Sequence, residues 1–472
     1  MDVNAISLFS GAGGLDWGLR EAGFRILFAN DVNNAAVSTH AANFGLKLEA
    51  CNRRGAEAQV GTALVCDVEH VDFSPLKDAG VDVVAGGPPC QDFSIVRGPD
   101  WDRRGIEVRR GRLYLHFVRV LNTLRPRAFI FENVPGLVTA NKGLAYKVIR
   151  DDFQRAGYEL VFSDVADLSV FGVPQRRERL IIVGVRRDLI GEVGDLWSAK
   201  AVFESALKTP FRIHPLTAIE ALEGRPLPEL RAEYEKIMQS WAGVWDEVGT
   251  ETARRWKQEV WDRLAFDAVK DYCLVNKIGR CNEEELELAF NAHREVLREL
   301  GYLGIRASEL KLPDGTTDPP ADSPDVLERL RRIPPGENHE FVRGTKWEVE
   351  GRGISLVYRR LHPLKPSYTI VAYGGGGTHG YHYERLRGTL TLRERARLQT
   401  FPDSFLFKGS KTEIRAQIGE AVPPLAAKRL GEALRTALKF LNRRASMHIG
   451  NAEAVLNEIA EHLKAFYSGF CC

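Results

Sequence analysis

The chain has 472 residues, of which 44% are hydrophobic, so it can form two or three domains with buried cores. Its 65 Lys and Arg residues balance 63 Asp and Glu residues, and the formal charge of +2 excludes an overall basic protein, so any nucleic-acid surface must be local. Seven scattered cysteines without CxxC pairs argue against a disulfide framework and against a structural zinc site.

The first residues lack a basic segment followed by a long apolar core, and nowhere do about 18 apolar residues run together. We therefore expect a soluble, cytoplasmic protein without a membrane partner. From the amino terminus, apolar runs of strand length alternate with helical stretches, at 5–9, 24–30, 81–87, 127–134, 160–167 and 179–185. This alternation predicts an α/β fold with a doubly wound, mostly parallel sheet.

The pattern changes after the last of these runs. Residues 191–351 are helical and mixed, with apolar residues at three-to-four spacing, and they predict a second domain. Its Pro- and Asp-rich segment at 311–325 indicates an exposed loop or linker. Residues 353–380 indicate strands and a glycine-rich loop, and 391–401 and 423–444 indicate helices. An amphipathic helix near the carboxyl terminus favours packing or dimer contacts over chemistry.

The stretch "SLFSGAGGLDWGL", at 7–19, has the strand, glycine-rich loop and helix of a doubly wound nucleotide site, although a tight turn would give the same pattern. Asp31 ends the next strand and could accept hydrogen bonds from both ribose hydroxyls. Asp67 repeats this geometry one strand later and could accept from an adenine amino group. The alternative for both aspartates is a helix N-cap.

"GGPPCQDFS" sets Cys90 behind two prolines at a strand end. A free cysteine is usually a small buried hydrophobe, but the prolines make a rigid shelf that presents the thiol. A thiolate needs a partner acid and cations. Glu132 ends another strand, and "QRRER", at 175–179, precedes a third, so both could supply them. Their alternatives are an ordinary ion-pair partner and a solvated edge.

Eight motifs in this order resemble those of the DNA (cytosine-5)-methyltransferases, which use S-adenosylmethionine. They are "LFSGAGG", "AND", "CDV", "GGPPCQDFS", "FENV", "QRRER", "LTLRERARLQTFPD" and "QIGEAVPP". The resemblance implies a Rossmann-like methyltransferase core with a second, mixed target-recognition domain, in an enzyme of the prokaryotic restriction-modification type. It implies no metal.

The resemblance also assigns residues to roles. The catalytic set would be Cys90, Glu132, Arg177 and Arg179. The cofactor contacts would be Phe9, Ser10, Gly11, Gly13, Gly14, Asp31, Val32, Asp67, Val68, Pro88, Glu420 and Ala421. The DNA contacts would be Gln91, Ser94, Arg97, Gln175, Thr369 and Ile370. Two positions depart from the family pattern: Glu420 stands where asparagine is usual, and Asp31 where glutamate is commoner.

Family chemistry explains these residue types. The Cys90 thiolate would add to carbon 6 of cytosine, Glu132 would bind ring nitrogen 3, and Arg179 would stabilise charge on the cytosine oxygen. The base must first leave the duplex. The loop at 97–112 carries six arginines against three acids and could close on DNA phosphates, although it could also be a solvated loop.

We expect a core at 1–187, a target-recognition domain with a helical insertion at 188–366, a closing segment at 367–443 and a tail at 444–472. The substrate would be double-stranded DNA, read in part by residues 351–400, where nine Lys and Arg face two Asp and Glu. We expect a monomer, with a cognate restriction endonuclease as a separate partner. The alternatives are an RNA methyltransferase, an inactive DNA-binding regulator and a nicotinamide oxidoreductase.

Overall fold

The computed structural model describes residues 3–89, 113–191, 193–279, 282–349, 357–373, 378 and 380–446. Four predicted site residues, Cys90, Gln91, Ser94 and Arg97, lie outside these ranges, as does the predicted amphipathic helix beyond residue 446. The described chain forms two compact units. The sheet unit lies within 1–171, 177–208 and 421–472, and the helical unit within 172–176 and 209–420. The four-segment division at 187, 366 and 443 stays a prediction.

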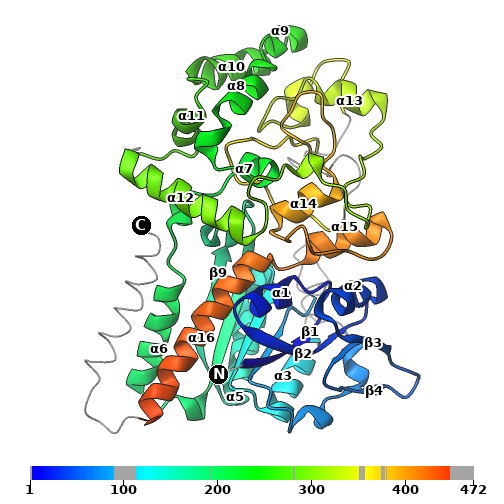
Figure 1. The fold of residues 1–472 in the computed structure, drawn as a ribbon, viewed down its shortest axis with the longest axis vertical. Helices are drawn as coiled ribbons and strands as arrows, with labels where there is room; N and C mark the ends of the chain where they lie inside the picture. The colour runs from blue at the N-terminus through cyan, green and yellow to red at the C-terminus, as the bar shows by residue number, and fades with distance from the viewer. Residues whose placement is uncertain are drawn as a thin grey trace. The chain divides into compact units, whose positions relative to one another are not determined.

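The sheet unit is built on an eight-stranded sheet in the order β3-β5-β2-β1-β7-β8-β10-β9 (Figure 1). All neighbours are parallel except β10, which runs antiparallel to β8 and β9. This mostly parallel sheet confirms the predicted fold class. The strands are β1 Val3–Leu8, β2 Phe24–Asp31, β3 Lys47–Ala50, β5 Thr62–Val65, β7 Val83–Gly86, β8 Ala128–Asn133, β9 Tyr158–Asp167 and β10 Glu178–Arg186. The short strands β4 Ala56–Glu57 and β6 Val71–Asp72 pair separately.

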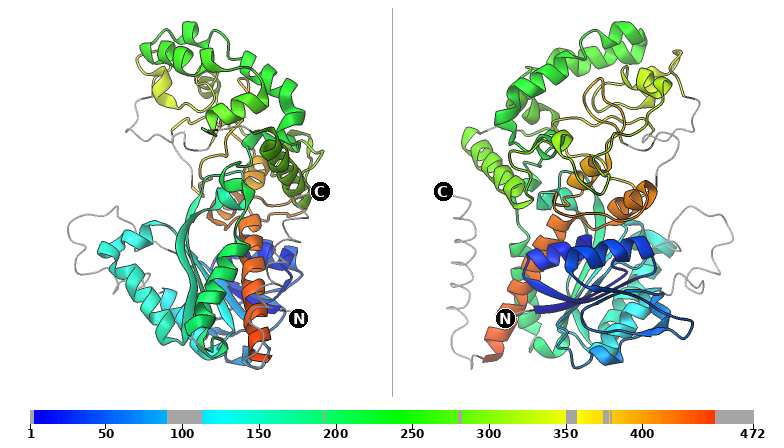
Figure 2. Two further views of the ribbon diagram at one scale, coloured as in Figure 1. Left: turned by 90° about the vertical axis from the view of Figure 1, so that its left-hand side faces the viewer. Right: turned by 45° about the vertical axis from the view of Figure 1, so that its right-hand side comes forward.

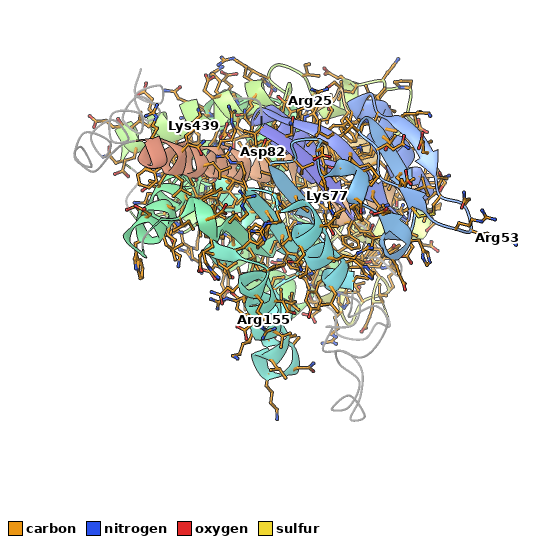
Figure 3. The ribbon with its side chains drawn as sticks, turned by 90° about the horizontal axis from the view of Figure 1, so that it is seen from below. Arg25, Arg53, Lys77, Asp82, Arg155 and Lys439 are labelled. Carbon is orange, nitrogen blue, oxygen red and sulfur yellow. A yellow bond between two sulfur atoms is a disulfide. The ribbon has the colours of Figure 1, made fainter. Side chains whose placement is uncertain are left out.

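Helices cover both faces of this sheet, as Figure 2 shows. One apolar core lies under α1 Gly14–Glu21, α6 Val193–Ala206 and α16 Pro424–Ser446, and α2 Asn34–Phe44 packs on a smaller cluster. The other core lies under α3 Leu113–Leu124 and α5 Leu144–Arg155. Buried β-branched and aromatic residues such as Val83, Val84 and Phe129 fill the strands between the helices, as a sheet covered on both sides requires. Figure 3 looks at the amino end of the sheet, where Arg25 and Asp82 lie.

The helical unit contains most of the predicted helical region. Its α-helices are α7 Ala218–Glu223, α8 Arg231–Gln239, α9 Val244–Val248, α10 Glu251–Glu259, α11 Ala268–Val275, α12 Glu283–Glu299, α13 Pro324–Leu330, α14 Leu392–Leu398 and α15 Lys411–Glu420. One of its cores is aromatic and includes Trp241 and Trp256. The buried Glu220 carboxylate joins other segments of the unit, because it bonds His293 Nδ1 at 2.9 Å and accepts from the Leu227 N–H at 2.8 Å.

Strands were expected within 353–380, and this expectation is wrong for the described part of that segment. It makes only isolated bridges, such as Arg360 with Tyr381. The segment is instead organised around the fully buried Arg360 guanidinium, which donates to the backbone oxygens of Ile333 at 2.7 Å, Leu330 at 2.6 Å and Glu384 at 2.8 Å. A side chain thus takes the bonding role that a strand ladder would have had.

The expectation against disulfides is also wrong. Cys51 and Cys66 form a disulfide with their Cα atoms 5.3 Å apart, and Cys273 is disulfide-bonded as well. The first pair follows β3 and β5 directly, and these two strands are neighbours in the sheet. Sequence spacing did not reveal the pair because β3 is short and largely exposed, so nothing in its pattern marks it as a strand.

Candidate active site

The carboxyl ends of five parallel strands meet at one edge of the sheet unit. The strand register places Leu8 of β1 beside Asn30 of β2 and Gly86 of β7, and β8 lies beyond β7. β5 joins the row because Val65 pairs with Asp31. In folds of this type ligands bind at this edge, and the predicted site residues of the sheet unit that the structure describes lie at strand ends, in loops and turns, or, for Gly14, at the start of helix α1.

The loop after β1 turns sharply before α1. Phe9 and Gly11 both have φ of 53°, and Gly13, the N-cap of α1, has φ of 96°. The turn is tied by the Ser10 N–H to the Asn30 oxygen and by the Gly13 N–H to the Ser10 oxygen, each at 3.0 Å. Because the glycines keep Cβ atoms out of the turn, backbone N–H groups from Gly14 onward stay within reach of a ligand.

Asp31 is oriented by the backbone around it. Its Oδ2 accepts from the Gly11 N–H and its Oδ1 from the Asn33 N–H, each at 2.9 Å. Burial raises the pKa of Asp31, and N–H donors, including that of Val32, oppose the rise. The N-cap of α2 is Asn33, whose side chain accepts from the Ala36 N–H, so Asp31 is not the cap. The Val32 side chain is 70% exposed and open to contact.

Asp67 does act as a cap, with one of its two oxygens. Its Oδ1 accepts from the Glu69 N–H at 3.1 Å at the start of the short turn Val68–His70. Its Oδ2 has no hydrogen bond to any residue that the structure describes, so it can accept one from a ligand. Val68 is buried in the apolar core, so only its backbone can serve the predicted contact.

Glu132 on β8 and Arg179 on β10 form an ion pair at the same edge, with 2.9 Å between Arg179 Nε and Glu132 Oε1. Their side chains are 13% and 14% exposed. Burial raises the pKa of Glu132, and the charges of Arg179 and Arg177 oppose that rise. A Cβ at Gly87 would lie 2.7 Å from Glu132 Oε2, so the chain passes the carboxylate only as glycine. The pair can bind a ring nitrogen and the neighbouring exocyclic oxygen of one ligand.

Pro88, two residues before Cys90, is hydrogen-bonded to the strand that carries Glu132. Asn133 Nδ2 donates to the Pro88 oxygen at 3.0 Å in a buried contact, and Asn133 Oδ1 accepts from the Val134 N–H. Pro88 is buried, as a rigid shelf would require. Asn133 is a site residue that sequence reasoning missed, although it lies inside the quoted motif "FENV".

Arg177 is placed differently from Arg179. Its side chain is 1% exposed, and its Nη2 donates to the Ala421 oxygen at 3.0 Å. Burial lowers the pKa of Arg177 to about 9, the Arg179 charge adds to that fall, and Glu132 opposes it. Arg177 therefore holds the backbone at Ala421, one of the predicted cofactor residues.

Gln175, Thr369 and Ile370 meet in the helical unit. Gln175 is fully buried, its Nε2 donates to Gln399 Oε1 at 2.8 Å, and its Oε1 accepts from the Ile370 N–H at 2.8 Å. The Thr369 hydroxyl donates to the Arg176 oxygen at 2.9 Å. The Gln175 side chain is thus used within the protein, and it orders the segment that carries Thr369.

In the helical unit, Glu420 and several arginines of the basic run make contacts within the protein. Glu420, the departure from the family pattern, hydrogen-bonds Tyr373, and this contact raises the pKa of the tyrosine. In the basic run at 351–400, four arginines are at most 1% exposed and cannot form a surface for DNA. They are Arg360, Arg393, Arg395 and Arg397.

Within the described ranges, no cluster of three His, Cys, Asp or Glu side chains could hold a metal ion. No described helix is both long enough and apolar enough to cross a membrane.

Residues 3–436 match the family model described as "C-5 cytosine-specific DNA methylase". The chain is 58% identical to the DNA (cytosine-5-)-methyltransferase M.ApeKI of Aeropyrum pernix, over 92% of this chain and 98% of the relative. It is 33% identical to the type II methyltransferase M.NgoFVII of Neisseria gonorrhoeae, over 91% of this chain and 85% of the relative. In fold it is similar to a prophage-encoded E. coli protein described as a DNA modification methyltransferase, with a TM-score of 0.56 at 22% identity, covering 93% of this chain and all of that one.

Proposed function

The chain belongs to the C-5 cytosine-specific DNA methylase family, and from this premise we propose that it transfers a methyl group from S-adenosylmethionine to carbon 5 of a flipped-out cytosine in double-stranded DNA. It is a DNA (cytosine-5-)-methyltransferase. The finer statements, on methyl donor, residue roles and partners, are our proposal.

The observation that carries the proposal is the Glu132–Arg179 ion pair, next to Pro88, which is hydrogen-bonded to the same strand as Glu132. Its carboxyl group and guanidinium lie 2.9 Å apart, and the strand bearing Glu132 also holds the Pro88 oxygen. Ring nitrogen 3 and the adjacent oxygen of cytosine match this pair. A carboxyl group whose pKa is raised by burial can keep the proton that nitrogen 3 needs.

The proposed cofactor site would accommodate an adenosine with a charged tail. Asp31 is held in place by two backbone N–H groups and can accept from ribose hydroxyls, and Asp67 Oδ2 can accept from an adenine amino group. The turn with Gly11 and Gly13 gives the tail access to backbone N–H groups. S-adenosylmethionine supplies a methyl group on a sulfonium sulfur.

In the proposed reaction, the Cys90 thiolate would bond to carbon 6, and Glu132 would donate its proton to nitrogen 3, which receives the electron pair displaced from the ring. Arg179 would stabilise charge on the exocyclic oxygen of carbon 2. Carbon 5 would then bond to the methyl group as the sulfonium–methyl bond breaks and S-adenosylhomocysteine leaves. A base would remove the carbon 5 proton, the Cys90 thiolate would leave with its electron pair, and nitrogen 3 would return its proton to Glu132. Bound water is our proposal for that base. Arg177 acts as a positioning residue through Ala421.

For the partners, we propose duplex DNA and a separately acting cognate restriction endonuclease, since two of the curated relatives that the chain matches are named type II methyltransferases. Gln91, Ser94, Arg97, Thr369 and Ile370 would contact DNA, and Gln175 would order the last two. We propose that the enzyme is a cytoplasmic monomer.

A variant with Cys90→Ser tests this proposal. It should lose methyl transfer to DNA yet keep S-adenosylmethionine binding by calorimetry, because the sulfur acts on the base. Cys273→Ser is the matched control and should keep turnover. Full turnover by Cys90→Ser would refute the mechanism.

A second test asks which polymer is the substrate. Duplex DNA with 5-fluorocytosine at the target should trap the enzyme covalently, since fluorine cannot leave as a proton, whereas RNA of the same sequence should not. Trapping on RNA alone would point to an RNA methyltransferase. Bisulfite sequencing of DNA from cells that express the chain would identify the modified base and its sequence context.

A further inference from the structure

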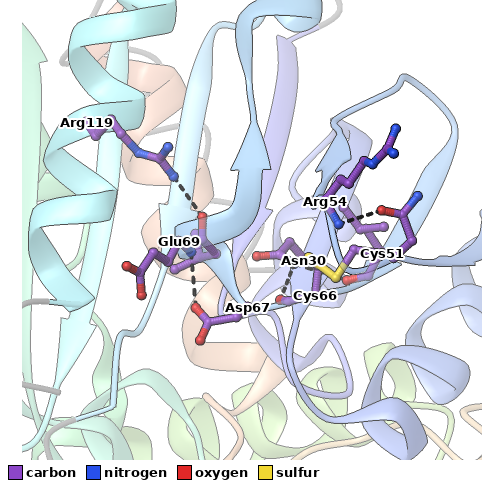
Figure 4. The surroundings of a disulfide bond; sticks show 10 residues. Asn30, Cys51, Arg54, Cys66, Asp67, Glu69 and Arg119 are labelled. Carbon is purple, nitrogen blue, oxygen red and sulfur yellow. Dashed lines mark hydrogen bonds between the residues drawn. A yellow bond between two sulfur atoms is a disulfide. The ribbon is translucent and has the colours of Figure 1, made fainter. Parts of the chain in front are cut away.

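The Cys51–Cys66 disulfide lies at the strand end that carries Asp67, as Figure 4 shows. We propose that this disulfide is a positioning element for the adenine side of the cofactor site, so that affinity for S-adenosylmethionine depends on its oxidation state. The inference rests on the proposed function, because it takes Asp67 as the adenine contact.

The end of β5 is held firmly on its inner side. Asn30 Nδ2 donates to the Leu64 oxygen at 3.1 Å and the Cys66 oxygen at 2.9 Å, both buried. The Cys66 N–H donates to the backbone oxygen of Asp31 at 3.0 Å. The backbones of the two predicted cofactor aspartates are therefore linked through one residue, Cys66, which adjoins Asp67 and bonds the main chain of Asp31.

The outer side has fewer constraints. There β5 pairs only with β3, a four-residue edge strand whose side chains are mostly exposed. Beyond the ladder, the Cys51 N–H donates to the Val65 oxygen at 3.0 Å. Edge strands with little burial open most readily. The disulfide covalently joins Cys51, which follows β3, to Cys66, which follows β5, and so holds the ends of these two strands together.

Asp67 depends on this backbone for its position. Among the residues that the structure describes, its side chain has one hydrogen bond, which is local, to the Glu69 N–H. On the far side of the turn, Arg119 Nη2 donates to the Val68 oxygen at 2.7 Å, which fixes the residue after Asp67 but not the one before it. A displacement of Cys66 would therefore move the Asp67 carboxylate relative to Asp31.

A dithiol such as dithiothreitol would convert the disulfide to two thiols and become a cyclic disulfide, passing two electrons to the protein. Losing a well-placed hydrogen bond to a charged group weakens binding roughly tenfold or more. We expect about this rise in KM for S-adenosylmethionine, with kcat and the KM for DNA changing by less than about twofold, because Glu132 and Arg179 lie on other strands.

The experiment uses the full chain carrying Cys273→Ser, because Cys273 forms a disulfide of its own that a reductant would also open. Oxidised, reduced and reoxidised protein are compared, with thiols counted at each stage. Binding of S-adenosylhomocysteine by calorimetry is measured beside KM and kcat. Reoxidation should restore the original KM. Cys51→Ser should match the reduced protein and should not respond to either treatment.

Asp67→Asn in the same background tests whether the effect passes through this carboxylate. Reduction should then change the affinity much less, because the contact that the disulfide positions is already weakened. The inference is overturned if protein with both thiols free binds as the oxidised protein does, or if kcat and both KM values worsen together as in general destabilisation. If oxidised protein fails to bind S-adenosylhomocysteine at all, the proposed cofactor role fails instead.

Discussion

Helix α14 carries three buried arginines with different surroundings, and these support a sharp prediction about stability. Arg393 bonds Asp314 Oδ2 at 2.9 Å and the Phe405 oxygen at 2.9 Å, with both charged side chains almost fully buried. The three guanidinium nitrogens of Arg395 are buried, and none makes a hydrogen bond to a residue in the described ranges. The two residues share one helix, so one can serve as the control for the other.

Substituting methionine should therefore have opposite effects at the two positions. Arg393→Met leaves Asp314 charged and unpaired and should destabilise the protein by about 3 to 5 kcal/mol. Burial, with the Arg415 charge, lowers the pKa of Arg395 from its usual value to about 10, which corresponds to about 3 kcal/mol of unfavourable burial of the charged form. Arg395→Met removes this term and should change stability by between zero and about 3 kcal/mol in the favourable direction.

Unfolding in guanidinium chloride, followed by tryptophan fluorescence, measures the change in unfolding free energy for both variants, because the aromatic core with Trp241 and Trp256 lies in the same unit as α14. At neutral pH the Arg395 side chain is still charged, so the stabilisation should be present there. It should shrink as pH rises through about 10, where the wild-type side chain loses its proton in the folded state. Equal destabilisation by the two variants would refute the reasoning.

Three further predictions concern the site and the fold. Burial raises the pKa of Glu132, so the activity that needs its proton should be present at lower pH and decline as pH rises through that pKa. Glu132→Gln should lower kcat and should remove this decline from the pH–rate profile. Asp31→Asn should weaken S-adenosylmethionine binding about tenfold or more in calorimetry, with the DNA affinity unchanged in a gel-shift assay. His293→Ala leaves the fully buried Glu220 without its imidazole partner and should lower the unfolding free energy by about 3 kcal/mol or more. Arg298 is exposed on the same helix, and Arg298→Ala should change the unfolding free energy by less than about 1 kcal/mol in the same assay.

The sequence predicted those parts of the protein that depend on local pattern. Apolar runs that end near Asp31 and Glu132 marked strands, and the mostly parallel sheet does bring these strand ends to one edge, whereas the roles of the side chains there stay a prediction. What it missed depends on long-range packing. The partners of Gln175 lie more than 190 residues away, and the Cys51–Cys66 bond depends on an exposed edge strand. Charge counts misjudged the basic run for the same reason, because Arg360 lies inside the protein.

The division of the chain has a consequence for biosynthesis. Helix α16 completes the apolar core of the sheet unit against α1, yet about 210 residues of the helical unit are translated between the last strand and that helix. At about 5 to 20 residues per second, the ribosome needs roughly 10 to 40 seconds to cover that stretch. During that interval the face that α16 will cover has no native partner, so a nascent chain halted before residue 424 should bind chaperones more strongly than a chain that includes α16. Methylation competence would thus arise only after α16 has been translated.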